Sequence, residues 1–346
     1  MSSASQKALL IPSKGAEFEV GTRSIPKPGP GEVLVKLHAA ALNPLDNIMQ
    51  KYGLFIESYP AVPGNDGAGT VEELGEGVIG LQKGDRVARG PLTAIPSKYS
   101  FDEAATIPLG FATAALGLYD KRGKHGRVNL PSVWSAAGGA ELPTPWSAAG
   151  RDKYKGHPAV ITGGASSVGQ FVIQLAKLSG FGPIITTASS RNAEYAKAAG
   201  ATHVIDYNTT SYADLPAAVA KITSTPVPLI YDVIASPESQ KASWAILAPK
   251  GTLVVSHDPV VGKLGEEAED SKRVELVWGS TTDSDWHEIG NDIWAHLTGL
   301  LETGAVKPNK VEVLPDGLAG IPAGVERVGQ GKVSGVKLVA HPQETA

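Results

Sequence analysis

The chain has 346 residues, 42% of them hydrophobic and 19% charged, which suits two globular domains with substantial cores. Its net charge of -4, with lysines and arginines scattered along the chain, gives no reason to expect nucleic-acid binding. It contains no cysteine, which excludes disulfides, a thiol nucleophile and thiolate-ligated metal sites. The first residues show no signal-type pattern and no apolar run approaches a membrane span, so we expect a cytoplasmic protein without a membrane segment.

The first 90 residues are expected to form a small β-rich domain. Short apolar runs between Gly and Pro clusters predict strands. These strands are expected at 6–11, 16–21, 32–39, 67–75 and within 84–90. An Ala- and Leu-rich stretch then predicts a helix at 107–119. Residues 121–156 are expected to form a loop, in which the pentapeptide WSAAG occurs at 134–138 and again at 146–150.

From residue 158 the pattern alternates between strand and helix. Strands are expected at 159–162, 184–187, 203–206, 229–234 and 251–256. Helices are expected at 170–178, 193–199, 212–222, 238–247 and 285–302. The alternation predicts an α/β fold whose open, mostly parallel sheet is covered by helices. Two tail strands, 311–314 and 336–340, suggest that the tail returns to the first domain.

A glycine-rich turn is the strongest chemical signal. The strand at 159–162 runs into Gly163, Gly164, Ala165, Ser166, Ser167 and Val168, and a helix follows. Glycines let the backbone approach a diphosphate, and the helix N-terminus offers free N–H groups to it. The spacing departs from G-x-G-x-x-G, and a plain turn is the alternative. The flanking strand, the helix and the further βα units favour nucleotide binding.

The next strand suggests which cofactor binds. It is followed by Ser189, Ser190, Arg191 and Asn192, and we expect no acid near them. NAD-binding folds usually place Asp or Glu about 20 residues past the glycines, to bind the ribose 2′-hydroxyl. Hydroxyl groups and a guanidinium instead suit a 2′-phosphate, so we predict NADP(H). The alternative, compatible with this role, is that Ser189 or Ser190 caps the following helix.

The chain resembles a medium-chain dehydrogenase/reductase of the zinc-independent enoyl reductase and quinone oxidoreductase branch. It most resembles fungal stand-alone enoyl reductases, some of which act in trans with polyketide synthases. The matching stretches are 40–53, 59–78, 84–88, 104–119, 161–177, 199–207 and 331–339. The resemblance implies a discontinuous GroES-like catalytic domain, 1–125 and 300–346, around a Rossmann NADP-binding domain, 126–299. Relatives dimerise through an edge of the nucleotide-domain sheet, which suggests Leu253–Val255 as that edge in a homodimer; a monomer is the alternative.

The resemblance also implies the reaction. Zinc-dependent relatives carry Cys and His where this chain has Asn43 and Asn65, and Asp66 alone could not hold the metal. We therefore expect no catalytic metal. NADPH would transfer hydride to the β-carbon of a small conjugated carbonyl substrate, such as an enoyl or enone compound. A quinone reductase is an alternative within the same class.

Several side chains are candidates by resemblance. Asn43 and Thr113 match positions near the nicotinamide, although a turn residue before a proline and a helix residue bonding to its own turn are the respective alternatives. Tyr52 could donate a proton or bind the substrate carbonyl, or it could simply pack. Tyr207 and Lys337 are further cofactor-binding candidates, with Lys337 reaching the diphosphate unless it is a surface strand lysine.

Two departures from the family keep another class of function open. Ile48 stands where many fungal relatives carry Lys, and the chain lacks a stretch that relatives have after Gly90. A more open pocket or a rearranged catalytic domain would follow. The remaining alternative is thus a cofactor-binding protein with little catalysis, such as a partner of a polyketide synthase.

Overall fold

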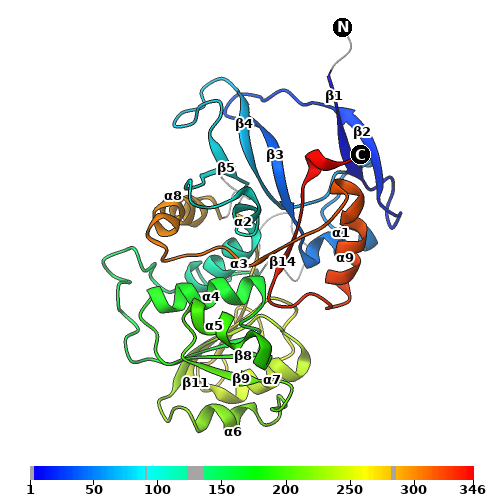
Figure 1. Cartoon of the computed structure of the whole chain (residues 1–346). Helices are drawn as coiled ribbons and strands as arrows, with labels where there is room; N and C mark the ends of the chain where they lie inside the picture. The colour runs from blue at the N-terminus through cyan, green and yellow to red at the C-terminus, as the bar shows by residue number, and fades with distance from the viewer. Residues whose placement is uncertain (1–3, 90–91, 124–135, 282–285) are drawn as a thin grey trace. The chain divides into compact units, whose positions relative to one another are not determined.

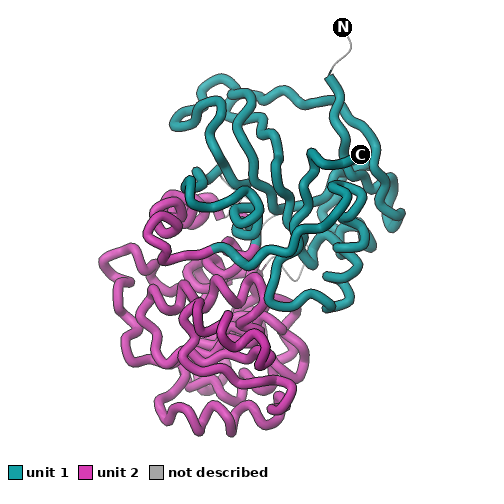
Figure 2. Tube along the Cα trace, in the orientation of Figure 1, with its two compact units in different colours: residues 1–109, 308–346 teal, residues 110–307 magenta. Residues whose placement is uncertain are grey.

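The computed structural model describes residues 4–89, 92–123, 136–281 and 286–346. The chain divides into two compact units, unit 1 with residues 1–109 and 308–346, and unit 2 with residues 110–307 (Figure 2). Both chain ends therefore belong to unit 1. The division differs from the expected domain boundaries at 125/126 and 299/300, which stay a prediction. Across the described ranges, no helix is both long and apolar enough to cross a membrane.

Unit 2 contains a six-stranded parallel sheet (Figure 1). Its strands, in chain order, are β7 (Ala159–Thr162), β8 (Ile184–Ala188), β9 (His203–Asp206), β10 (Val227–Asp232), β11 (Leu247–Val255) and β12 (Arg273–Leu276). The spatial order β12-β11-β10-β7-β8-β9 is that of a doubly wound nucleotide-binding fold. The expected α/β class is confirmed. The expectation that Leu253–Val255 forms the sheet edge is wrong, because β12 lies outside β11.

Helices α4 (Ser167–Leu178), α5 (Ala193–Ala199) and α7 (Pro237–Ile246) pack against this sheet. The other helices here are α3 (Pro108–Tyr119), α6 (Leu215–Ala220) and α8 (His287–Thr303). In Figure 1, α4 and α5 lie beside each other, as their contacts also show. The strands are nearly all buried, which explains their continuous apolar runs. Val160, Ile185, Ile230 and Leu253 lie in one buried cluster between the sheet and its helices.

Unit 1 is built on a mostly antiparallel sheet of order β13-β14-β3-β4-β5-β6, with a separate hairpin β1–β2. The strands are β1 (Ser5–Leu10), β2 (Glu19–Ser24), β3 (Val33–Ala41), β4 (Asp66–Leu74), β5 (Arg86–Ala88), β6 (Thr93–Ala94), β13 (Val311–Val313) and β14 (Lys337–Ala340). The tail strand β14 pairs with β3, opposite Ala40 and Ala41. The expected strand content and the return of the tail to the first part of the chain are therefore confirmed.

The sequence patterns did not predict three helices of unit 1, which are α1 (Pro44–Tyr52), α2 (Phe101–Ala105) and α9 (Ile321–Gly329). Asn43 precedes α1, Pro44 is its first residue and Gly53 ends it in a left-handed conformation. Pro is favoured at a first helical position, but Asn before Pro also suggests a turn. Helix α9 contributes Ile321 and Val325 to a buried cluster that also holds residues of β1 and β14.

The two copies of WSAAG lie in different surroundings within unit 2. In the second copy, Trp146 Nε1 donates to Asp292 Oδ2 of α8 at 2.8 Å, and the indole stacks on His296. In the first copy, residues 134 and 135 lie outside the described residues, and the Gly138 N–H donates to the Leu276 carbonyl of β12 at 2.9 Å. The duplication is therefore local, as expected from a single repeat.

Candidate functional site

The glycine-rich turn of unit 2 is held by its neighbouring strand. Gly163 adopts a left-handed φ of 67° directly after β7. Its N–H donates to Thr187 Oγ1 at 3.0 Å, and the Gly164 N–H donates to the Thr187 carbonyl at 2.9 Å. Ser166 then caps α4, its Oγ accepting the Gly169 N–H at 3.1 Å. The bonds from β8 and the cap fix the turn before any ligand arrives.

Two of the glycines are needed for close packing. A Cβ on Gly164 would lie 2.1 Å from Thr186 Oγ1, and one on Gly169 would lie 2.3 Å from the Gly163 carbonyl oxygen. Both distances are far shorter than real contacts. A larger residue would therefore push α4 away from the turn and disturb the N–H groups at its start. This cradle fits a diphosphate, which binds where backbone and helix N-terminus approach closely.

The predicted phosphate-binding residues follow β8. Ser189 is buried and its Oγ accepts a bond from Asn192 Nδ2 at 3.2 Å. Ser190 and Arg191 are exposed in the short 3₁₀ turn Ser190–Asn192. Neither serine side chain caps this turn or α5, so the alternative capping role is wrong. The backbone instead makes the turn, with the Asn192 N–H donating to the Ser189 carbonyl at 2.9 Å.

An acidic residue that we did not expect stands beside them. Asp206 pairs with Ala188 across β8 and β9, and its Oδ2 accepts the Ser190 N–H at 3.0 Å. The backbone N–H and side-chain amide of Asn208, together with Ser190, hold the pKa of Asp206 below its usual range. The expectation that no acid lies near these residues is thus wrong, because the fold brings Asp206 to Ser190. The carboxyl ends of parallel strands meet at one sheet edge, and this signal could have identified Asp206. The adjacent Tyr207 is 47% exposed.

A buried polar cluster in unit 1 brings together two predicted residues. Lys337 Nζ lies 2.8 Å from Asp66 Oδ2 and donates to Asn43 Oδ1 at 2.6 Å. Asn43 Nδ2 in turn donates to Asp66 Oδ2 at 2.8 Å. The Leu109 N–H donates to the other Asp66 oxygen at 2.7 Å. Lys337 is only 4% exposed, so its interpretation as a surface lysine is wrong.

Asp46 lies next to this cluster with an unpaired oxygen. Its Oδ2 accepts the Asn43 N–H at 2.7 Å, whereas Oδ1 is buried and has no hydrogen-bond partner among the described residues. Burial, together with the nearby Asp66 carboxylate, raises the pKa of Asp46 to about 6. The Asn43 N–H, Lys337 and Arg89 oppose the shift.

The other candidates are dispersed. Tyr52 ends α1 and is 67% exposed, which does not suit a packed aromatic. Thr113 is partly exposed in α3 of unit 2, and its carbonyl accepts the Tyr231 hydroxyl at 2.8 Å. Asn65 Nδ2 lies 3.9 Å from Met49 Sδ. In the part of the chain that the structure describes, no three His, Cys, Asp or Glu residues gather where they could hold a metal ion.

Known proteins match both units. Residues 29–121 match the family described as alcohol dehydrogenase GroES-like domain, and residues 167–275 match the family described as zinc-binding dehydrogenase. Trans-enoyl reductase tazE of Aspergillus terreus is 31% identical over 59% of this chain and 69% of its own length. The chain belongs to the medium-chain dehydrogenase/reductase superfamily.

Other matches in the superfamily span the whole chain. Dehydrogenase orsE of Emericella nidulans is 29% identical over 98% of this chain and 99% of its own length. The crystal structure of CurK enoyl reductase shares the fold, with a TM-score of 0.70 at 22% identity, covering 97% of this chain and 99% of its own. The predicted family and the GroES-like and Rossmann folds are thus confirmed. The protein is an oxidoreductase of a superfamily that uses nicotinamide cofactors.

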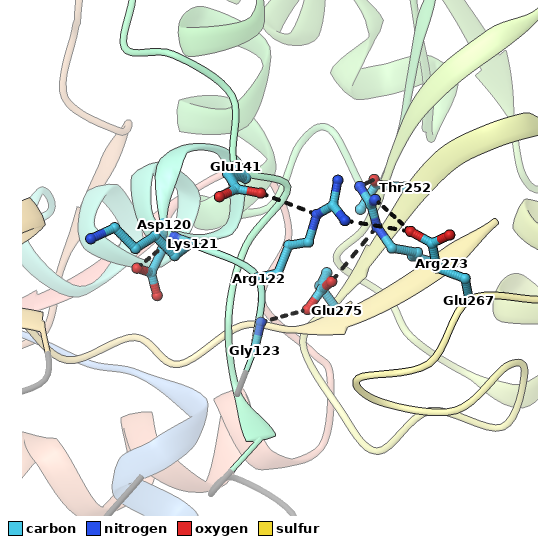
Figure 3. Close-up of polar contacts among 9 residues, drawn as sticks. All are labelled: Asp120, Lys121, Arg122, Gly123, Glu141, Thr252, Glu267, Arg273 and Glu275. Atoms are coloured by element: carbon cyan, nitrogen blue, oxygen red, sulfur yellow. Dashed lines mark hydrogen bonds and ion pairs between the residues drawn. The ribbon is translucent and has the colours of Figure 1, made fainter. Parts of the chain in front are cut away.

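Unit 2 of this medium-chain dehydrogenase/reductase carries a second polar network, away from the predicted residues (Figure 3). Arg122 Nε lies 3.1 Å from a Glu141 oxygen and its Nη1 lies 3.4 Å from Glu267. Arg273 lies 3.3 Å from the same Glu267 oxygen and 4.0 Å from Glu275. The chain of alternating charges connects the end of α3 to the edge strand β12.

Glu275 is the buried end of this network. The Gly123 N–H donates to Glu275 Oε2 at 3.0 Å (Figure 3). Burial raises the pKa of Glu275 to about 7, although the Gly123 N–H, Arg273 and Arg122 favour its charged form. Sequence patterns missed β12 and this residue, because a four-residue strand with Arg273 and Glu275 lacks an apolar run.

Removing the buried ammonium should destabilise the protein strongly. Lys337→Met leaves Asp66 charged and buried, so we expect the free energy of unfolding to fall by about 3–5 kcal/mol. The matched control is Lys83→Met, since Lys83 pairs at 3.7 Å with Glu72 on the exposed surface of the same unit. That change should cost at most about 1 kcal/mol. Urea unfolding measures both, and equal losses would contradict the structural role of Lys337.

The raised pKa of Asp46 predicts a pH dependence. Between pH 3.8 and about 6 the native state holds a proton on Asp46 that the unfolded chain releases. The free energy of unfolding should therefore fall by about 2–3 kcal/mol through this group as the pH rises from 4 to 7. Asp46→Asn should remove this decrease and keep the acceptor for the Asn43 N–H. Urea unfolding at several pH values measures this. If the free energy of unfolding falls equally with pH in the original protein and in Asp46→Asn, the prediction is wrong.

The close packing of the glycine cradle can be tested with two helix glycines. Gly169→Ala should lower the free energy of unfolding by at least about 2 kcal/mol, because its Cβ would overlap the Gly163 carbonyl. Gly299→Ala in α8 meets open space and should instead stabilise by about 0.5–1 kcal/mol. Thermal unfolding of the two variants gives the comparison. A melting temperature unchanged in Gly169→Ala would show that the turn is not tightly packed.

Proposed function

We propose that the protein is a zinc-independent, NADPH-dependent reductase of carbon–carbon double bonds conjugated to a carbonyl. The observation that carries this proposal is the glycine cradle of unit 2 with Ser190 and Arg191 exposed beyond the next strand. Its support in the comparisons is the relatives named trans-enoyl reductase. The amides of Asn43 and Asn65, which are poor zinc ligands, support a reaction without the metal.

The residues present fit a bound dinucleotide. The backbone of Gly163 and Gly164 and the first turn of α4, from Ser166 to Val168, would hold the diphosphate. Ser189, Ser190, Arg191, Asn192 and Tyr207 would surround the adenosine ribose, and the exposed Arg191 guanidinium would bind a 2′-phosphate. Asp206 opposes that phosphate, so the preference for NADPH rests on Arg191. When bound, NADPH supplies the hydride for the reduction.

The chain's own residues would orient the reactants and handle the proton. Asn43 is fixed by Lys337 and Asp66, which leaves one amide hydrogen of its side chain to bind the nicotinamide carboxamide or the substrate. Thr113 offers a hydroxyl for the same purpose. The exposed hydroxyl of Tyr52 would donate to the substrate carbonyl or deliver the proton. Lys337, if it turned from Asp66, would reach the diphosphate.

The proposed setting follows from the relatives. The substrate is a small conjugated carbonyl compound or an enoyl thioester, and a polyketide synthase is the proposed partner if the protein acts in trans. We propose a cytoplasmic monomer or homodimer.

The deciding experiment follows NADPH oxidation with a 2-enal, an enone, an enoyl thioester and a quinone, with NADH in parallel. We expect turnover of the enone or thioester with NADPH. Arg191→Ala and Ser189→Asp should each lower kcat/KM for NADPH by at least about tenfold. The first removes the cation that attracts the 2′-phosphate, and the second adds a carboxylate that repels it. Neither should lower kcat/KM for NADH by as much.

The matched control is Ser224→Asp, which adds a carboxylate at an exposed site of unit 2 outside the candidate residues. It should leave both cofactors unaffected. NADPH binding without turnover of any compound would overturn the reductase and favour a cofactor-binding protein. Turnover of the quinone alone would favour the quinone reductase.

A further inference from the structure

Unit 1 contains a large cavity that the proposed reaction does not use. Its volume is about 830 Å³, within the range of sites for small molecules. The wall comes from β1, β2, β3, α9 and the C-terminal residues, all of unit 1. Most of its buried lining is apolar and includes Leu9, Leu42, Leu318, Ile321 and Val325.

Apolar side chains also face solvent where the cavity opens. Ile25, Leu37 and Val62 line the cavity and are 37%, 38% and 46% exposed. Single exposed apolar residues are ordinary, but three that share one cavity with a buried apolar wall form a continuous apolar surface. Such a surface favours a ligand with an apolar body.

The charged residues of the wall separate along β3. Lys36 is the fourth of the nine residues of β3, and Ala41, the last, pairs with Asp66. The five residue steps from Lys36 to Ala41 span roughly 17 Å. Asp46 also lines the cavity, and helix α1, to which it belongs, begins shortly after the end of β3. The acidic groups therefore lie at the inner end of β3.

The other cations of the wall, Lys7 and Arg23, belong to the hairpin β1–β2. Arg23 of β2 pairs with Gln6 at the start of β1, and the neighbouring Lys7 Nζ donates to the Thr345 carbonyl at 3.0 Å. The same C-terminal segment reaches β3, where Gln343 Nε2 donates to the Leu37 carbonyl at 3.0 Å. Figure 1 shows the C-terminus beside β1 and β2.

Two of these cations are free to bind a ligand. Glu72 of the wall is paired with Lys83, and Lys7 with the C-terminal carbonyls. The exposed side chains of Arg23 and Lys36 have no ion pair or hydrogen bond within the described ranges. The mouth is thus basic, whereas Asp46 and Asp66 would repel an anion from the inner end.

We propose that this cavity binds a long-chain carboxylate, with the carboxylate at Arg23 and Lys36 and the alkyl chain along β3 toward Leu42. The apolar wall matches the chain, and the charge separation along β3 sets its direction. None of the lining residues is among those proposed to hold the dinucleotide, so ligand binding here can be tested separately from the reductase activity.

The test is a fluorescence titration of the full chain with cis-parinaric acid, an 18-carbon polyene carboxylate. We expect saturable one-to-one binding, with a dissociation constant on the order of micromolar. The double variant Arg23→Glu/Lys36→Glu should weaken binding at least tenfold, while Lys332→Glu, on the exposed surface of unit 1 outside the cavity, should not. Both charge variants lie at exposed positions, so folding should be preserved.

A second pair of variants tests the apolar wall. Leu37→Asp at the opening should weaken binding at least tenfold, and Ile79→Asp, which is 93% exposed and outside the cavity, should not. Saturating NADPH should leave binding unchanged. No saturable binding, equal binding by all variants, or displacement by NADPH would overturn the proposal. Equally tight binding of the corresponding alcohol would overturn the role of the basic mouth.

Discussion

The buried pair of Lys337 and Asp66 is the interaction on which unit 1 depends. It joins the last strand of the chain to β4, and through Asn43 it also fixes the start of α1. Three segments far apart in sequence thus meet at one ammonium group. A buried ion pair contributes little net stability by itself, but losing one partner leaves an uncompensated charge. The pair therefore holds the strand β14 to β4 and to the start of α1.

In unit 2, backbone groups and hydroxyl side chains hold the glycine-rich turn, in place of a buried ion pair. The glycine cradle leaves N–H groups at the start of α4 and uses Thr187 and Ser166 to hold the turn. No charged side chain is needed there, because the helix terminus carries the partial positive charge. Charged groups instead follow the neighbouring strand, where the exposed Arg191 lies one residue after Ser190, whose N–H Asp206 accepts.

Much of the fold follows from local sequence patterns. β7 and β9 begin and end at the predicted residues, because each apolar run is bounded by turn residues. Helix α5 does so too, since Gly200 cannot readily extend it. Helix α1 and strand β12 were missed for the converse reason. Asn43 before Pro44 resembles a turn, and the charged residues Arg273 and Glu275 interrupt the apolar pattern of β12.

The site was predictable only where its residues are neighbours in sequence. The cradle from Gly163 to Val168 is such a case. The pairing of Lys337 with Asp66 and the approach of Asp206 to Ser190 are set by which strands lie side by side. A single sequence carries no direct signal for such pairings. For the same reason, the charge separation along the cavity wall was not foreseen.

The edge of the parallel sheet shows what the first WSAAG copy does. Strand β12 is outermost, and an uncovered edge would offer its hydrogen-bonding groups to a strand of another chain. Gly138 occupies the Leu276 carbonyl, and Gly123 binds the Glu275 side chain. A Cβ on Gly138 would lie 2.1 Å from the Gly123 nitrogen, so only glycine lets the two segments close over the strand. The last residue of the first WSAAG copy thus occupies one backbone acceptor of β12 that a strand of another chain could otherwise bind.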